Sequence, residues 1–233
     1  MTLLSVCHSK KILIMSYSFS NSYFNKASLL LVFLLLSATL SISCSSDDTL
    51  TRTAADPKLV ADAKNFLSGD IVLSTTATMN GVNKTLLETG CPTKFNFTWS
   101  NSDPRIFTVS LLDFTVGKMG MIISFKCDVT TMQLNDWEKH EYGREGWIKF
   151  EGANGSVWGT DTKGASSTAN GSYVKGYYDV NSHKIEFIVD YNMMNVRSEC
   201  FLQTIDKSRI NNFEAEFAQY EKDLAAYKKE HGL

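Results

Sequence analysis

Cys44 is the residue whose surroundings point most directly to a chemical role. It follows a long apolar segment: residues 29–36 are all leucine, valine or phenylalanine, and residues 27–40 are interrupted only by three hydroxyl side chains. The segment is shorter than the roughly 20 apolar residues that span a membrane, but it fits the hydrophobic part of an export signal. A thiol placed directly after an export signal can be acylated. We therefore expect cleavage before Cys44 and attachment of its sulfur to lipid.

The residues upstream complete an expected signal peptide over residues 1–43. Three lysines supply the positive charge that precedes the apolar part of such a signal. A start at Met15 would give a signal of more ordinary length than a start at Met1. Two alternatives stay open. Cleavage at a site such as Ala38 would leave Cys44 an ordinary cysteine, and an uncleaved signal would serve as an N-terminal anchor.

The residues around Cys44 also carry a resemblance. The sequence LSISC at residues 40–44 resembles a bacterial lipobox, and SSDD at residues 45–48 resembles the tether of surface-exposed lipoproteins of the Bacteroidota. Thr49 lies in an Asp-Thr-Leu pattern similar to the one at which these bacteria O-glycosylate exported proteins. The resemblance implies a lipid-anchored protein of the outer membrane, exposed at the cell surface, with Thr49 as a candidate glycosylation site.

Charge and length limit the partners of the mature chain. The 233 residues carry a net charge of −2, and residues 1–43 hold 3 of the 23 basic residues and none of the 25 acidic ones. Their removal leaves 20 basic and 25 acidic residues, a net charge of −5. Proteins that bind the phosphate backbone of nucleic acids normally present a basic patch, so we expect no nucleic-acid partner. Residues 44–56 read as a tether and residues 57–233 as a single domain.

Helices are predicted at both ends of this domain. Asp56 and Pro57 form a capping residue and a first helical residue, and apolar side chains at a spacing of three to four continue to Leu67. Near the C-terminus, an aromatic and aliphatic stripe predicts an amphipathic helix over residues 211–231. We expect that helix to pack on the outside of the domain or across one end, although a partner-binding helix is the alternative.

Between the helices the apolar period changes to two, which is the period of β-strands. The clearest example is residues 119–130, where apolar residues occupy every second position. The other alternating segments are 71–75, 95–99, 107–111, 112–116, 147–150, 157–159, 173–180, 185–191 and 199–205. A change of phase predicts a bulge near Leu111. Sequential strands joined by short turns favour an antiparallel up-and-down meander closed into a barrel, with a β-sandwich as the alternative.

Turns and loops are expected where the alternation fails. Asn154-Gly155 and Asn170-Gly171 have the composition of tight turns. Residues 135–146 form a charged, aromatic connection, and residues 159–170 form a loop of low complexity. Loops of this size at the rim of a barrel are common places for ligand contact, although the commoner interpretation of both is that they are solvated hairpin tips.

The arrangement of a short helix, about eight strands and a C-terminal helix resembles the calycin or lipocalin-like barrel. The resemblance covers residues 69–232 in pattern, without the Gly-x-Trp motif of lipocalins, since Gly69 is followed by Asp70 and Ile71. It implies a carrier of an apolar ligand. The candidate ligand contacts are four aromatic residues of the strands and loops. These are Phe97, Trp99, Trp137 and Trp158.

Three cysteines remain in the mature domain. An exported chain can form disulfides, and Cys91 with Cys200 is the candidate pair. Cys127 lies on the apolar face of its strand and reads as a small buried side chain. The mature chain has three histidines, far apart, and no Cys-x-x-Cys or His-x-x-x-His spacing, so we expect no metal and no cofactor.

Catalytic motifs are not evident in the sequence. Residues 155–159, GSVWG, differ from a Gly-x-Ser-x-Gly nucleophile motif because the serine comes one position early. Acids on the predicted strands could pair only through the fold, and Asp113 at the predicted bulge is the one to inspect. We expect a non-enzymatic, membrane-anchored protein that binds an apolar small molecule or a glycan through its barrel or rim loops. The alternatives are an accessory subunit of a cell-envelope complex and, last, a hydrolase with scattered carboxylates.

Overall fold

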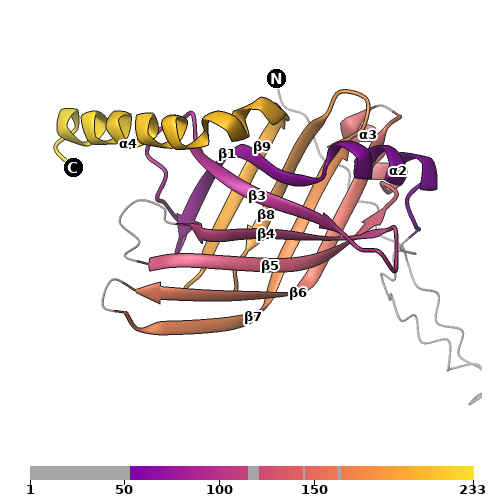
Figure 1. Ribbon diagram of the computed structural model, residues 1–233, viewed down its shortest axis with the longest axis horizontal. Helices are drawn as coiled ribbons and strands as arrows, with labels where there is room; N and C mark the ends of the chain where they lie inside the picture. The colour runs from indigo at the N-terminus through magenta and orange to yellow at the C-terminus, as the bar shows by residue number, and fades with distance from the viewer. Residues whose placement is uncertain (1–52, 115–120, 144, 162–163) are drawn as a thin grey trace, which may run out of the picture. The chain divides into compact units, whose positions relative to one another are not determined.

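The computed structural model describes residues 53–114, 121–143, 145–161 and 164–233, together forming one compact unit. This unit is mainly β, and its strands follow one another around an antiparallel barrel (Figure 1). The strands of the barrel are β1 (Gly69–Met79), β3 (Cys91–Trp99), β4 (Ile106–Phe114), β5 (Met121–Met132), β6 (Trp147–Asp161), β7 (Ser166–Asp179), β8 (Lys184–Asp190) and β9 (Val196–Thr204). Pairing of β1 with β9 closes the barrel, and the short β2 (Val82–Asn83) pairs with β1 outside it. The predicted up-and-down barrel is confirmed.

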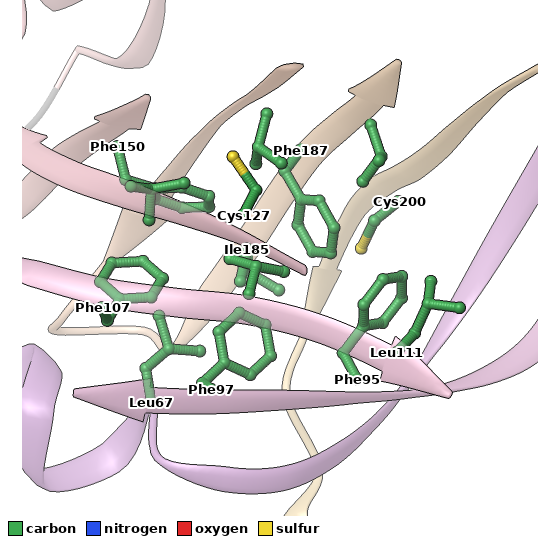
Figure 2. Close-up of a cluster of buried hydrophobic side chains, with 14 of the residues drawn as sticks. Leu67, Phe95, Phe97, Phe107, Leu111, Cys127, Phe150, Ile185, Phe187 and Cys200 are labelled. Carbon is green, nitrogen blue, oxygen red and sulfur yellow. The ribbon is translucent and has the colours of Figure 1, made fainter. Parts of the chain in front are cut away.

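Large apolar side chains fill the barrel. The residues that alternate inward along each strand form one buried cluster, in which Phe95, Phe97 and Phe187 meet edge to face (Figure 2). The ring centroids of Phe95 and Phe187 are 5.0 Å apart, a separation typical of favourable aromatic pairs. The two hollows described below are lined mainly by residues outside this cluster.

Strand β4 carries the predicted bulge. Leu111 pairs with Phe125, but the next paired residues are Phe114 and Ile123, so β4 uses one residue more than β5 over this stretch. A bulge reverses which face the following residues occupy. It therefore explains the change of phase in the apolar pattern of β4.

Strands β6 and β7 are longer than the sequence predicted. The segments 147–150 and 157–159 belong to one strand, and most of the predicted loop 159–170 lies in the β6–β7 ladder. Asn154-Gly155 and Asn170-Gly171 are not chain-reversing turns but irregularities within these strands, where the register shifts. A Cβ on Gly152 would lie 2.1 Å from the carbonyl oxygen of Asp128, so glycine is needed for close approach of β5.

Helix α2 (Pro57–Phe66) begins as predicted and packs on the barrel. The Asp56 side chain accepts a hydrogen bond of 2.7 Å from the backbone nitrogen of Lys58, which satisfies a free donor of the first turn. Buried side chains of α2 join the barrel cluster, and the indole of Trp99 donates to the carbonyl of Leu67 at 2.6 Å. Helix α2 therefore covers apolar side chains at one end of the barrel.

That end also receives the N-terminal tether. The backbone nitrogen of Gln133 donates to the carbonyl of Thr53 at 2.9 Å, and Ala54 forms an isolated β-bridge with Met132. Helix α3 (Asp136–Tyr142) follows directly, within the connection predicted at residues 135–146. We call the end of the barrel that holds α2, α3 and residues 180–183 the tether end, and the opposite end, with residues 80–90 and 191–195, the distal end.

The C-terminal segment lies outside the barrel. A 3-10 helix, η1 (Lys207–Asn212), leads into α4 (Phe213–Glu230), close to the predicted 211–231. Helix α4 packs beside β3, and its C-terminal part extends past the start of that strand (Figure 1). Within the part of the chain that the structure describes, no helix is long and apolar enough to cross a membrane.

Candidate functional site

A groove runs between α4 and the outer wall of the barrel. Its volume is about 1120 Å³, slightly above the roughly 300–1,000 Å³ of typical small-molecule sites. One wall comes from the apolar stripe of α4, and the other comes from outward-facing residues of β3 and β4. The residues used below are Lys94, Asn96, Leu112, Phe213, Phe217 and Tyr220.

The apolar stripe of α4 is only partly covered by the barrel. Tyr220 and Leu224 are buried against Cys91. Phe217 and Phe213, about one and two turns before Tyr220, are only partly buried. Across the groove, Leu112 is 70% exposed, which is unusual for a leucine in the middle of a strand. A ligand in the groove would therefore meet apolar surface on both walls.

Polar groups lie between these apolar walls. The side-chain nitrogen of Asn96 donates to the carboxylate of Asp70 at 2.8 Å, and the Lys94 ammonium lies 5.4 Å from the centre of the Phe213 ring. Arg209 binds Glu216 and also donates to the Ser74 hydroxyl at 3.4 Å, which fixes the start of α4 to β1. The groove thus combines aromatic faces with a few oriented polar groups, as ligand sites commonly do.

The buried end of the groove is electrically neutral. Burial raises the pKa of Cys91 to about 11, and burial, with a smaller contribution from neighbouring Cys91, raises the pKa of Tyr220 well above its usual value. Both groups are therefore protonated at neutral pH. A protonated thiol is a poor nucleophile, so Cys91 supplies an apolar contact here and no covalent chemistry.

A second hollow of about 680 Å³ lies at the tether end. Leu59 of α2, Leu134 and Trp147 form its apolar lining, and Lys139 of α3 borders it. It lies beside the residues that hold the tether. Because α3 borders this hollow, the shape of the hollow depends on how α3 is fixed to the barrel.

Glu138 holds α3 in place. Its backbone nitrogen donates to the side-chain oxygen of Asn135, which caps the helix. Its carboxylate in turn accepts from the Asn135 backbone nitrogen, from the Tyr177 hydroxyl at 2.8 Å and from the Lys149 ammonium at 3.0 Å. Burial favours the protonated form, but these bonds outweigh it and lower the pKa of Glu138. The Tyr142 ring packs against that of Tyr177 at a tilt of 35°, with ring centroids 4.5 Å apart. This cluster was not predicted from the sequence, where its only signal is the Asn-x-x-Glu capping pattern.

The four predicted ligand aromatics do not come together. Phe97 and Trp99 are buried inside the barrel, Trp137 is 77% exposed on α3, and Trp158 is 40% exposed on the outer face of β6. Alternation along a strand gives two faces but does not say which aromatic residues of different strands share one. The groove aromatics Phe213 and Phe217 were instead part of the stripe predicted on the C-terminal helix.

The predicted disulfide between Cys91 and Cys200 is not formed. Cys91, Cys127 and Cys200 are all free and buried. Thr75 of β1 pairs with Cys91 on one side and with Cys200 on the other, so two strand spacings, or roughly 10 Å, separate the cysteines. Disulfides join Cα atoms less than about 7 Å apart. Cys44 and Thr49, the candidate lipid and glycan attachment sites, lie outside the described residues.

The strand acids have local partners. Asp128 accepts a hydrogen bond from Thr108 at 2.6 Å, and Glu186 accepts one from Tyr142. Asp113 lies at the bulge, but its side chain is outside the description. His183 occupies the β7–β8 turn, where it stacks on Phe66 with ring centroids 3.6 Å apart. No group of three or more histidine, cysteine or acidic residues among the described side chains could hold a metal ion.

Residues 44–232 match the model of a family described as a domain of unknown function, DUF4903. The chain belongs to the DUF4903 family. It matches none of the curated proteins and none of the solved structures. The DUF4903 match spans α2, the whole barrel and α4, so both walls of the groove belong to the family domain.

Proposed function

We propose that this protein is a non-enzymatic lipoprotein, anchored at the surface of the bacterial outer membrane, that binds an apolar small molecule or a glycan in the groove beside α4. The observation that carries this proposal is the incomplete burial of the α4 stripe. Phe213 and Phe217 face an exposed Leu112 across a groove of about 1120 Å³. A helix that served only to close the fold would bury that stripe against the wall.

The groove is a better site than the barrel interior. The interior is filled by side chains such as Phe95, Phe150 and Phe187, each at most 3% exposed. A ligand there would have to displace close-packed aromatic rings, which is costly in a core packed to crystal-like density. The groove offers apolar contact without that cost.

The lipid anchor is supported by two features of the sequence. The lipobox-like residues 40–44 follow an apolar segment of signal-peptide length. The family match also begins at Cys44, the residue expected to become the mature N-terminus. A domain tethered there would reach ligands from a fixed surface.

Substitution of Leu112 by aspartate tests the groove. Purified protein would be screened against glycans and apolar small molecules, and the best ligand titrated by calorimetry. Because Leu112 is exposed, Leu112→Asp should leave folding intact but weaken binding about tenfold or more, since 1.4 kcal/mol corresponds to a factor of ten. Leu202→Asp, on β9 and 48% exposed, is the matched control and should bind as the wild type does. Equal binding by all three proteins would refute the groove as the site.

A second candidate function is that of an accessory subunit in an envelope complex. Leu112, Ile122 and Trp158 leave apolar surface exposed on three successive strands, and Trp158 pairs across the ladder with Ser124, two residues from Ile122. Exposed apolar surface of this kind is common at protein interfaces. Pull-down from detergent-solubilised membranes should then return an envelope protein that Ile122→Lys releases. Recovery of this chain alone would count against the candidate.

A further inference from the structure

The place where the tether joins the barrel limits how the domain can lie on a membrane. Thr53 comes nine positions after Cys44, and a fully extended chain of that length spans about 30 Å. Thr53 and Ala54 are bonded to Gln133 and Met132 at the tether end. If Cys44 carries lipid, as proposed above, the tether end lies within that distance of the bilayer.

Trp137 is presented at this same end. It stands four residues after Gln133, so its Cα lies within about 15 Å of the residue that binds the tether. Its side chain is 77% exposed, although tryptophan is among the residues that proteins bury most. The exposure does not come from a loose segment, because the Asn135 cap and the partners of Glu138 fix α3 to the barrel.

An ion pair and one further acid lie beside Trp137 on α3. Asp136 and Lys139 form an ion pair of 3.2 Å across one turn of α3, so neither charge is unopposed near the indole. The exposed Glu141 stands four residues after Trp137, on the same side of the helix, so this face is suited to zwitterionic rather than anionic headgroups. Tryptophan is enriched at the level of lipid headgroups, where its ring is partly apolar and its N–H can donate to water or lipid.

We propose that Trp137 inserts into the lipid headgroup region of the membrane that holds Cys44, which fixes the tether end of the barrel toward the bilayer. This inference rests on the proposed lipid anchor. It leaves the α4 groove on the outer side of the barrel, open to ligands beside the membrane. The other exposed tryptophan, Trp158, lies eleven residues along β6 from Trp147, or roughly 36 Å toward the distal end.

Fluorescence quenching by lipid tests this orientation. The full-length lipidated protein would be reconstituted into phosphatidylcholine vesicles with and without brominated acyl chains, and flotation would establish that it is anchored. Trp137→Phe and Trp158→Phe, each subtracted from the wild type, isolate the emission of one indole. The emission of Trp137 should lose most of its intensity in brominated vesicles, and that of Trp158 should not change.

The outcomes distinguish the membrane contact of Trp137 from the lipid anchor at Cys44. Protein that floats with the vesicles but keeps unquenched Trp137 emission would overturn the contact and leave the anchor standing. Equal quenching of Trp137 and Trp158 would overturn the proposed orientation. Protein that fails to float would overturn the anchor, and the contact would fall with it. Circular dichroism of both variants would verify that the exposed substitutions leave the barrel folded.

Discussion

Glu138 is a buried carboxylate whose partners come from the elements on which α3 packs. Tyr177 lies on β7 and Lys149 on β6, and both bind the same carboxylate that caps the helix. A charge taken out of water is stable only when it is paired and hydrogen-bonded in this way. The ionised form of Glu138 therefore connects the protonation of one residue to the docking of α3.

Glu138→Gln should destabilise the protein at neutral pH and have less effect in acid. The lost charge-assisted bonds should reduce the free energy of unfolding by about 2 kcal/mol. Because folding lowers the pKa of Glu138, its contribution is present above the unfolded pKa and is lost as the pH falls through the folded pKa. Urea unfolding at neutral pH and in acid measures the difference in the free energy of unfolding between the wild type and Glu138→Gln.

The matched control for this prediction is Asp136→Asn. Asp136 is fully exposed on the same helix, and its pair with Lys139 is open to water, so little change is expected at either pH. If the difference in the free energy of unfolding between the wild type and Glu138→Gln became larger in acid, the assigned direction of the pKa shift would be contradicted.

The three buried thiols give a second prediction for single residues. Burial raises the pKa values of Cys91 and Cys127 to about 11 and that of Cys200 further. Native protein should therefore leave all three unmodified by iodoacetamide, and denatured protein without reductant should be alkylated at each. Peptide mass spectrometry identifies the sites. A disulfide-linked peptide containing Cys91 and Cys200 would contradict the pairing of both residues with Thr75.

Among the elements, the strands show what sequence reasoning can and cannot reach. The alternation of apolar residues predicted the barrel strands, and the phase change predicted the β4 bulge. The Asn-Gly pairs of β6 and β7 were wrongly predicted to form tight turns, because the residues that favour turns also permit bulges and close backbone contact. Only the neighbouring strand decides between these uses, as at Gly152, where β5 leaves no room for a Cβ.

Gly176 has a similar role inside the barrel. It pairs with Phe150 on one side and Phe187 on the other, and an added Cβ would lie 2.4 Å from the Phe187 Cβ and 2.7 Å from the Glu186 carbonyl oxygen. The glycine thus makes room for the two aromatic side chains.

Gly176→Ala should destabilise the barrel by about 2 kcal/mol, because overpacking forces neighbouring strands apart. Thr168→Ala, at an exposed position of the same strand, is the control and should change stability little. The measurement is chemical unfolding followed by tryptophan emission. Equal stability of the two variants would show that β7 can shift without cost.

At the scale of the whole molecule, the fold was more predictable than the site. Periodicity identified the barrel, α2 and α4, since those patterns are local. The groove depends on how far α4 stands from β3 and β4, and the cluster around Glu138 depends on contacts between α3, β6 and β7. Neither relation can be derived from spacing along the chain.

The location of the protein is the central claim, because the proposed orientation assumes a lipid anchor and the proposed role of the groove is that of a surface-anchored protein. Three acyl chains, as lipoproteins of the resembled kind carry, would hold the domain to the membrane far more firmly than the marginal binding of one chain. Removal of the Cys44 sulfur should therefore release the protein from the outer membrane.

The most direct test is the outer-membrane content of Cys44→Ala compared with Cys7→Ala, which changes the only other cysteine upstream of the barrel. Immunoblots of separated membrane fractions would measure both variants beside the wild type. We predict that Cys44→Ala disappears from the outer membrane and that Cys7→Ala remains there. Cys44→Ala present in the outer membrane at the wild-type level would contradict the lipid anchor.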